Sequence, residues 1–405
     1  MPGMADPSST PFRVLIAGSG VAGLEAVLAL RHLVGDRVEL TVLSPEREFV
    51  YRPMAVAQPF ARGHARRHVV ADLLGPLGVT VVSDALSHVD DAARAAFTRD
   101  GDQLSYDALL VAVGADAVPA FQRVRTWTPD ADAEIYGGLL RDLEEGYSKA
   151  VGFVIPVGVA WPLPAYELAL MTAWDARDMG QDDVEITVYT HEASPLGIFG
   201  AAASNALRED LEAAGIRVET SAHVSQAANG RLVSEPGQRE ITAQRVVALP
   251  RAAGRALPGL PVDDGGFILT DRFGKVSGTD AVWAAGDAIA YPVKQGGLAA
   301  QEAEAAATAI AAAAGAAVEP APFRPVLRGV LLTGRGQAWM RHALSDETDE
   351  GAAERHALFW PPTKIAGRYL SPYLAQVEEA EDLGADARPE GAPVELDLER
   401  EAPAG

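Results

Sequence analysis

The hydrophobic pattern near the start of the chain changes from strand-like to helical and back. Residues 13–17 form a short apolar run with the length of a buried strand. Apolar side chains recur at helical spacing over 24–33, and 38–43 alternates between apolar and polar positions. A strand, a helix and a second strand in this order predict a βαβ unit with a parallel sheet.

The same two kinds of pattern recur along the rest of the chain. A second set of apolar strands and helices lies in the middle of the sequence, so we predict an α/β fold with two Rossmann-like domains and a small α+β unit at the C-terminal end. The further predicted strands are 106–115, 150–155, 184–189, 281–288 and 326–332, and the predicted helices are one ending near Met171, 203–214 and about 298–314.

The loop after the first strand has glycine at the three positions of a G-x-G-x-x-G pattern. Gly18 permits a tight turn, Gly20 lets a pyrophosphate approach the backbone, and Gly23 lets the helix pack close to the strand. Free N–H groups and the helix dipole then attract the phosphates. Because a strand precedes the loop and a helix follows it, we expect a dinucleotide site rather than a turn without a ligand. The loop consists of Gly18, Ser19, Gly20, Val21, Ala22 and Gly23.

The end of the second strand departs from the usual dinucleotide pattern. Ser44 stands where an acidic residue normally binds the adenosine ribose. Its hydroxyl can still hydrogen-bond a ribose, and Glu46 is a second candidate. The alternative is that Ser44 only opens the turn before Pro45.

Three segments, 18–23, 111–115 and 284–287, resemble in order and separation the flavin-binding signatures of the two-dinucleotide-domain flavoprotein reductases. The chain looks most like the branch of sulfide:quinone oxidoreductase and flavocytochrome c sulfide dehydrogenase, with type II NADH dehydrogenases as cousins. This resemblance covers about 12–375 and implies that FAD is the cofactor. The supporting local matches are 43–44, 49–53 and 292–296.

The later signatures suggest how a flavin is held. Asp287 follows Gly286 at the end of a strand and can accept hydrogen bonds from ribityl or ribose hydroxyls. A helix that begins near Gly296 directs its dipole toward the pyrimidine edge of the flavin. Lys294 adds a positive charge there, unless it is an ordinary surface lysine. The other expected FAD-binding residues are Ser44, Pro53, Gly114 and Gln295.

The second βαβ unit has an altered ligand loop. Counted back from Glu167, the three glycine positions fall on Ala160, Pro162 and Ala165. Pro162 and Pro164 have no N–H to donate to a phosphate and resist the required backbone conformation. Direct use of NAD(P)H is therefore less secure than the use of FAD.

The chain contains no cysteine, which excludes thiol and disulfide redox chemistry. The sulfide-oxidising relatives carry a redox cysteine near the flavin, so their mechanism cannot be transferred. Glu167 and Lys294 are the candidate catalytic residues. Glu167 matches an acid of the type II NADH dehydrogenases and can assist proton transfer from an apolar pocket, or it is a helix N-terminal glutamate favoured by the dipole. Trp161 can stack on the flavin or a substrate, or fill the core.

Charge limits the partners. The 34 basic and 56 acidic residues give a net charge of −22, which disfavours nucleic acid and anionic membranes. The N-terminus lacks a signal-peptide pattern and no apolar run reaches about 18 residues, so we expect a cytoplasmic protein without an integral membrane segment. The eight histidines show no metal-ligand spacing. Arg62, Arg66 and Arg67 form a basic cluster that is either a solvated face or the border of an anion site.

The C-terminal part is dense in aromatic residues at 356–370, a segment that resembles the one closing over the flavin in relatives, or that is simply part of a packing domain. Lys364 and Arg368 are candidate charges on the substrate side. The expected organisation is 1–11 disordered, 12–120 and 263–322 the FAD-binding domain, 121–262 the second Rossmann-like domain, 323–375 the C-terminal cap, and 376–405 an acidic disordered tail.

The sequence thus predicts an FAD-dependent oxidoreductase that passes electrons from a small donor to a quinone or a soluble acceptor without a cysteine redox centre. One alternative is an NAD(P)H dehydrogenase of the type II kind. Another is a flavin-binding regulatory partner without turnover. A homodimer is left open.

Overall fold

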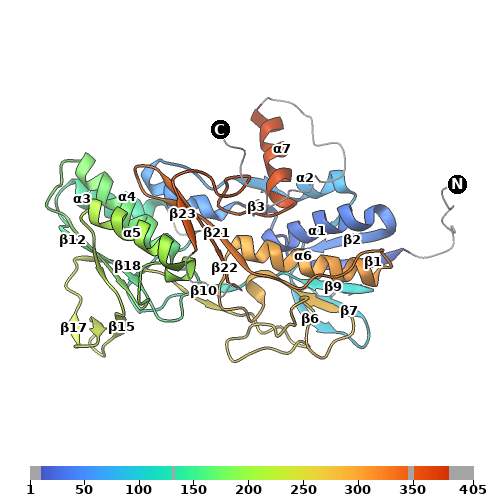
Figure 1. The fold of residues 1–405 in the computed structure, drawn as a ribbon. Coiled ribbons are helices and arrows are strands. Elements are labelled where there is room, and N and C mark those ends of the chain that lie inside the picture. The colour runs from blue at the N-terminus through green and yellow to red at the C-terminus, as the bar shows by residue number, and fades with distance from the viewer. Residues whose placement is uncertain (1–10, 130–132, 345–350, 383–405) are drawn as a thin grey trace.

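The computed structural model describes residues 11–129, 133–344 and 351–382. Two parallel sheets, each with its own helices, form the body of the molecule (Figure 1). This confirms the predicted α/β fold class. The expected disorder at 1–10 and 383–405 lies outside the described residues.

The first sheet has five parallel strands built from both ends of the sequence. Its helices α1 (Val21–Val34) and α6 (Gly296–Ala313) pack against each other on one face, and Figure 1 shows β6 and β7 on the other side. Buried aliphatic side chains fill the space between the sheet and the two helices. In sheet order the strands are β20 (Val282–Ala284), β9 (Ala108–Val111), β1 (Phe12–Ala17), β2 (Val38–Leu43) and β5 (Thr80–Val82), and the small antiparallel sheet is β6 (Leu86–Asp90), β7 (Ala95–Thr98) and β8 (Gln103–Ser105).

The second sheet is also parallel and five-stranded. The helix α4 was predicted to end near Met171, but it continues to Asp178 because Thr172, Ala173 and Ala176 extend its buried face. In sheet order the strands are β11 (Arg125–Thr126), β18 (Arg245–Ala248), β12 (Ala150–Ile155), β13 (Glu185–Thr190) and β14 (Arg217–Glu219), and the helices are α3 (Ala133–Glu144), α4 (Leu163–Asp178) and α5 (Gly200–Ala213).

Smaller sheets connect and cover these two units. The antiparallel pair of β10 (Asp116–Val118) and β19 (Arg251–Ala253) lies where the chain passes between the two large sheets. The remaining elements are β3 (Glu48–Val50), the 3₁₀ segment η2 (Arg52–Phe60), β4 (Arg67–Val69), α2 (Val70–Leu74), β10 (Asp116–Val118), β15 (His223–Gln226), β16 (Leu232–Glu235), β17 (Arg239–Glu240), β19 (Arg251–Ala253), η5 (Gly286–Ala288), and the 3₁₀ turns η1 (Gly35–Arg37), η3 (Gly75–Leu77) and η4 (Gly197–Phe199).

The C-terminal part consists of an antiparallel sheet and a final helix. The sheet is formed by β21 (Val326–Leu332), β22 (Gln337–Ala343) and β23 (Ala352–Glu354). The helix α7 (Leu370–Asp382) lies against α1 and α2 (Figure 1). Residues 376–382 were expected to be disordered, and this expectation is wrong: Glu378 of this stretch is held by Arg66 at 2.7 Å.

Candidate functional site

A cavity of about 1050 Å³ opens at the carboxyl ends of both parallel sheets. In parallel α/β sheets this edge is the usual ligand site. One part of its lining comes from the first sheet, another from the loop before α4, and a third from the C-terminal segment around Lys364. The cavity therefore joins three parts of the chain that are far apart in sequence.

The glycine loop adopts the geometry that a phosphate needs. Gly18 has a φ of +117°, and a Cβ there would lie 2.2 Å from the carbonyl oxygen of Ala112. A Cβ on Gly23 would lie 2.0 Å from the carbonyl oxygen of Gly18, so this glycine is required for packing and does not line the cavity. A Cβ on Gly20 would meet nothing within 4 Å. The open side of Gly20 faces the room that a pyrophosphate would fill.

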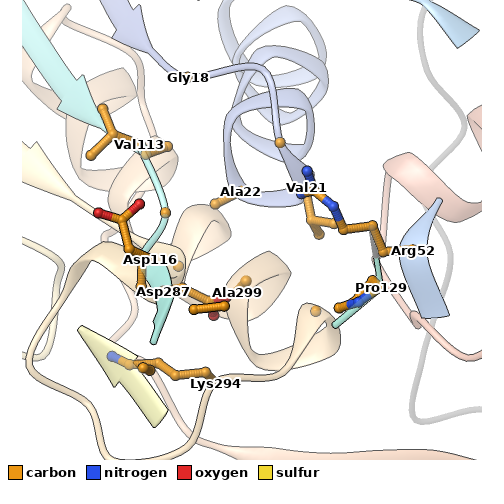
Figure 2. Close-up of a pocket in the computed structure, with 18 of the residues that line it drawn as sticks. Gly18, Val21, Ala22, Arg52, Val113, Asp116, Pro129, Asp287, Lys294 and Ala299 are labelled. Atoms are coloured by element: carbon orange, nitrogen blue, oxygen red, sulfur yellow. The ribbon is translucent and has the colours of Figure 1, made fainter. Parts of the chain in front are cut away.

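Most of the predicted cofactor residues meet in this cavity. Figure 2 shows the loop around Gly18 and Val21 on one side of the opening, with Asp287 and Lys294 on the other. The predicted residues that line it are Gly18, Ser19, Gly20, Val21, Ala22, Ser44, Pro53, Gly114, Gly286, Asp287, Lys294, Gln295 and Gly296.

Ser44 is held by two local contacts. Its hydroxyl lies 2.8 Å from the hydroxyl of Ser19, and it accepts a hydrogen bond from the backbone N–H of Glu46 at 3.2 Å. Ser44 thus both opens the turn and joins the second strand to the glycine loop. Ser44 and Glu46 both line the cavity, so both candidates for a ribose contact stay in place.

The turn that carries Asp287 is held in place by a hydrogen bond to Glu302 on α6. Gly286 has a φ of +75°, and its N–H donates to the buried carboxyl group of Glu302 at 2.8 Å. Burial raises the pKa of Asp287, while Lys294 and Arg52 counteract the shift. Burial likewise raises the pKa of Glu302 to about 8. Sequence reasoning missed Glu302 because a glutamate within an alanine-rich helix has no recognisable motif.

Lys294 is no ordinary surface lysine. Its ammonium group donates to the carbonyl of Ile289 and lies 4.1 Å from the centre of the Phe267 ring. Burial lowers the pKa of this ammonium group, and Asp287 opposes the shift. The backbone N–H of Lys294 donates to the carbonyl oxygen of Ala160 at 3.2 Å, which links this segment to the loop before α4.

Glu167 and Lys364 form a buried ion pair on the wall of the cavity. Their side chains are 1% and 7% exposed, and Lys364 Nζ lies 2.5 Å from Glu167 Oε1. The backbone N–H of Leu332 donates to the same oxygen at 2.8 Å. Burial raises the pKa of Glu167 and lowers the pKa of Lys364, and each charge partly offsets the shift of the other. The proton affinities of the two groups therefore move toward each other.

The structure bears on the role of Glu167 and on the two candidate charges Arg368 and Lys364. The first turn of α4 contains no acidic residue, so Glu167 is not an N-terminal glutamate of that helix. Arg368 does not line the cavity, and its guanidinium lies 3.4 Å from Glu304 instead. Lys364 does line the cavity, as a candidate substrate-side charge should.

The basic cluster of the sequence is fully engaged with acidic side chains. Arg62 lies 2.5 Å from Asp175, Arg66 lies 2.7 Å from Glu378, and Arg67 lies 3.1 Å from Glu48. None of these three arginines lines the cavity. Other arginines do line it: Arg52, which lies in the matching segment 49–53, and Arg99, Arg251 and Arg255, which no motif indicated. Figure 2 shows the Arg52 side chain extended toward Val21 at the start of α1, close to the expected phosphates.

Side chains of the protein occupy the region around the loop before α4, where a second dinucleotide would bind. Trp161 lines the cavity and packs edge-on against Phe199, with ring centres 5.7 Å apart. Beyond the end of β13, the carboxyl group of Glu192 accepts hydrogen bonds from Tyr166 at 2.6 Å and Thr190 at 2.8 Å. Glu192 follows the second strand of this βαβ unit, the position from which an acid usually binds a ribose, but its carboxyl group is already hydrogen-bonded to neighbouring side chains.

The glycines, the acidic turn and the size of the cavity fit FAD. Gly20 and Gly114 present open backbone, and Gly114 has a φ of +72° that favours glycine. The basic side chains of Arg52 and Lys294 suit the negative charge of a diphosphate and a reduced ring. Within the described residues, no helix has the length and apolar character needed to cross a bilayer.

Comparison with known proteins identifies a family that matches most of the chain. A family model described as pyridine nucleotide-disulphide oxidoreductase matches residues 12–145 and 165–313. The unmatched stretch between them contains β12 and the proline-containing loop. An NADH dehydrogenase-like protein of Mycobacterium tuberculosis is 28% identical over 297 residues, which is 69% of this chain and 73% of that protein.

Solved structures show the same fold at low sequence identity. The sulfide:quinone oxidoreductase of Aquifex aeolicus superposes with a TM-score of 0.75 at 18% identity, covering 97% of this chain and 100% of that chain. A ferredoxin reductase from Rhodopseudomonas palustris gives a TM-score of 0.61 at 19% identity, covering 82% and 83% of the two chains. Because the family model matches well over half of the chain, the protein belongs to the pyridine nucleotide-disulphide oxidoreductase family and is an FAD-dependent oxidoreductase.

Proposed function

We propose that the protein transfers electrons from a small donor through FAD to a quinone or a soluble acceptor, and that Glu167 with Lys364 manages the accompanying proton. The observation that carries this proposal is the cavity itself, which is lined by both the dinucleotide loop and the buried ion pair. The chain has no cysteine, so no thiol stands between the donor and the flavin.

Each predicted domain has a separate role in this proposal. Residues 12–120 and 263–322 would hold the cofactor, 121–262 would cover it, and 323–375 would complete the cavity wall. Two features support this division: β20 joins the first sheet beside β9, and Lys364 reaches the cavity from the C-terminal segment.

The chain's own groups bind and orient the cofactor in this proposal. The N–H groups of the glycine loop and the guanidinium of Arg52 would hold the diphosphate. Asp287 would accept hydrogen bonds from hydroxyl groups, and its turn is fixed by Glu302. The start of α6 at Gly296 and the ammonium of Lys294 would stabilise negative charge on the ring. When bound, FAD supplies the carrier that accepts and releases the electrons.

Glu167 and Lys364 would hold the proton next to that carrier. Burial raises the pKa of Glu167 and lowers the pKa of Lys364, so the charged forms of both groups are less favoured than in water and a proton can pass more readily to or from the pair. The apolar side chains of Trp127, Val159 and Leu163 line the same cavity and would limit the access of water to it.

A second candidate is an NAD(P)H dehydrogenase, and the NADH dehydrogenase-like relatives favour it. Two observations weigh against it. Pro162 and Pro164 remove N–H donors from the loop where a second dinucleotide would bind. Glu192 is already bonded to Tyr166 and Thr190.

The test is an absorbance spectrum of the purified protein followed by anaerobic titration with NADH, NADPH and sulfide. We expect a yellow protein whose flavin band is bleached by a small donor and restored by a quinone analogue or a soluble carrier. Bleaching by NADH or NADPH within seconds would establish the second candidate instead. A colourless protein that does not take up FAD would overturn the cofactor and the function together.

A further inference from the structure

Glu25 is a buried acid that the proposed function does not use. It lies on α1 two residues after Gly23, and it is 0% exposed. The surrounding positions of the helix are apolar and pack into the core of the first sheet. A buried carboxyl group is strongly unfavourable unless hydrogen-bond donors surround it. Its partners therefore indicate its role.

The carboxyl group of Glu25 caps the N-terminus of α7. The N–H of Tyr369 donates to Oε1 at 2.9 Å, and the N–H of Leu370 donates to Oε2 at 2.8 Å. The first N–H groups of a helix have no partner within the helix, and they attract negative charge. Here the acid comes from a helix more than three hundred residues away in the sequence.

The approach between the two segments requires glycine at position 367. A Cβ on Gly367 would lie 2.6 Å from Glu25 Oε2. Alanine in this place would force either the segment or the carboxyl group to move. Gly367 and Glu25 therefore fit each other closely.

Hydrogen bonds within the segment connect this cap to the residue next to Lys364. Ser371 Oγ accepts from the N–H of Gly367 at 2.9 Å and donates to the carbonyl of Ile365 at 2.8 Å. The N–H of Ile365 donates to the hydroxyl of Tyr51 at 2.9 Å. Lys364, the neighbouring residue, then meets Glu167 at 2.5 Å.

We infer that Glu25 is a positioning residue: by capping α7 it holds the segment 364–371 in place and so keeps the ammonium group of Lys364 on Glu167. The inference rests on the proposed function for the importance of the ion pair, but the geometry that it describes can be tested without turnover. The N-terminal end of the same helix α1 would receive the diphosphate one turn before Glu25, so one element would position both the cofactor and the lysine.

The chain offers a direct probe of this geometry, because it has only four lysines: Lys149, Lys275, Lys294 and Lys364. Acylation of the FAD-loaded full chain followed by mass spectrometry reports the accessibility of each amine. The exposed Lys149 serves as the internal reference, since its side chain is 39% exposed. Labelling at about pH 9 keeps amines reactive, and it is above the value of about 8 to which burial raises the pKa of Glu25, so the carboxylate is ionised.

Glu25→Leu removes both acceptors and should raise the labelling of Lys364 relative to Lys149 by roughly tenfold or more, as expected for the loss of hydrogen bonds to a charged group. Glu25→Gln retains one acceptor oxygen and should give an intermediate increase. Gly367→Ala places a methyl group against the carboxyl group of Glu25 and so disturbs the same contact from the other side, which should also raise the labelling of Lys364. The Gly367→Ala variant keeps the inference testable if the Glu25 variants do not fold.

Tyr373→Phe is the matched control. It removes the hydrogen bond from Tyr373 to the carbonyl of Leu73, another contact of α7, without touching the segment 364–371. Its Lys364 labelling should stay within about twofold of the parent protein. Unchanged labelling of Lys364 in Glu25→Leu and Gly367→Ala would overturn the inference. A parallel increase at Lys275 and Lys294 would also overturn it, because it would show general loosening. None of these outcomes depends on the identity of the donor or the acceptor.

Discussion

The two glycines Gly20 and Gly23 are equally prominent in the sequence but have different tasks in the structure. A Cβ on Gly23 collides with the backbone of Gly18, whereas a Cβ on Gly20 meets only open space. Gly20 also has an extended backbone conformation that any residue can adopt. We therefore propose that the first glycine serves the ligand, whereas the second is required by the packing of the fold.

Gly20→Val should therefore weaken FAD binding without disturbing the apoprotein. Its side chain would occupy the space that a diphosphate needs, and we expect at least a tenfold rise in the FAD dissociation constant, roughly the effect of losing one to two charge-assisted hydrogen bonds. The melting temperature of the apoprotein should stay the same. Gly23→Ala is the contrasting variant, and it should lower the melting temperature even without FAD. Equal effects of the two variants on the apoprotein would contradict the assignment.

Glu167→Gln should retain FAD and lose turnover. The amide cannot exchange a proton, and general acid–base groups commonly contribute about 10²-fold or more to a rate. Because burial raises the pKa of Glu167, its protonated form persists to higher pH than in an exposed glutamate. If the acid supplies the proton during reoxidation, the rate falls as pH rises through this pKa, and the Gln variant lacks that limb of the pH profile.

Glu192→Gln is a matched control for this experiment. Glu192 is another glutamate next to the second sheet and is half-buried, but it is bonded to Tyr166 and Thr190 and does not line the cavity. Its turnover should stay within about twofold of the parent protein. Lys364→Met should shift the alkaline limb to higher pH, because Glu167 would lose the cation that lowers its pKa. Full turnover in Glu167→Gln would remove the proton role.

The helix α6 depends on one side chain at its start. Gln295 accepts the N–H of Leu298 at 2.8 Å, and its amide donates to the carbonyl of Arg328 at 3.1 Å. It thus caps the helix and also fastens it to β21. The sequence placed Gln295 near the flavin, but only the structure shows that it also serves as the cap.

Gln295→Ala should lower stability by about 1–2 kcal/mol, the usual loss for a helix cap, and it should weaken FAD binding because the start of α6 borders the cavity. Gln301→Ala is the control. Gln301 bonds the backbone of Val326 from the same helix but does not line the cavity. Urea unfolding should show a loss in both variants, whereas the FAD dissociation constant should rise only for Gln295→Ala. A rise in both would mean that helix stability alone governs FAD binding.

The bounds of a strand or helix could be predicted from the sequence where one face of the element, or the whole element, is apolar. The strands β2, β12 and β21 have the predicted bounds, because each is a short apolar or alternating run between turns. The ends of α4 and α7 were not predictable. Their final turns are polar in composition and are held by tertiary contacts, such as the ion pair between Arg66 and Glu378.

Across the whole molecule, two buried glutamates link stability to pH. Burial raises the pKa of Glu25 and of Glu302 to about 8, from an ordinary value of 4.5. The native protein therefore holds more protons than the unfolded chain between these values. Their contribution to stability is fully present below about pH 4.5 and is lost as pH rises to about 8. The repulsion within a chain of net charge −22 acts in the same direction.

Glu302→Gln should flatten this dependence. The amide still accepts the N–H of Gly286 but has no proton to lose, so the free energy of unfolding should fall less steeply between pH 5 and 8 than in the parent protein, by roughly the slope of one proton. Urea unfolding of the apoprotein at several pH values measures the slope. An unchanged slope would mean that Glu302 is already ionised in the native state.

The sequence alone determined the chemistry that lies within short stretches of chain. The loop from Gly18 to Gly23 and the pair Gly286–Asp287 could be identified because a phosphate turn and an acidic turn need particular residues at fixed spacing. Composition added the absence of thiols. These signals are local, so one sequence suffices to detect them.

The tertiary structure decided which distant groups act together. Glu167 and Lys364 are separated by 197 positions, and Glu25 and Leu370 by 345, so no spacing rule connects them. Each is buried, and a buried charge or polar group is stable only when a partner lies within hydrogen-bonding distance. That requirement is satisfied in space rather than along the chain, which is why the fold reveals these partners and the sequence does not.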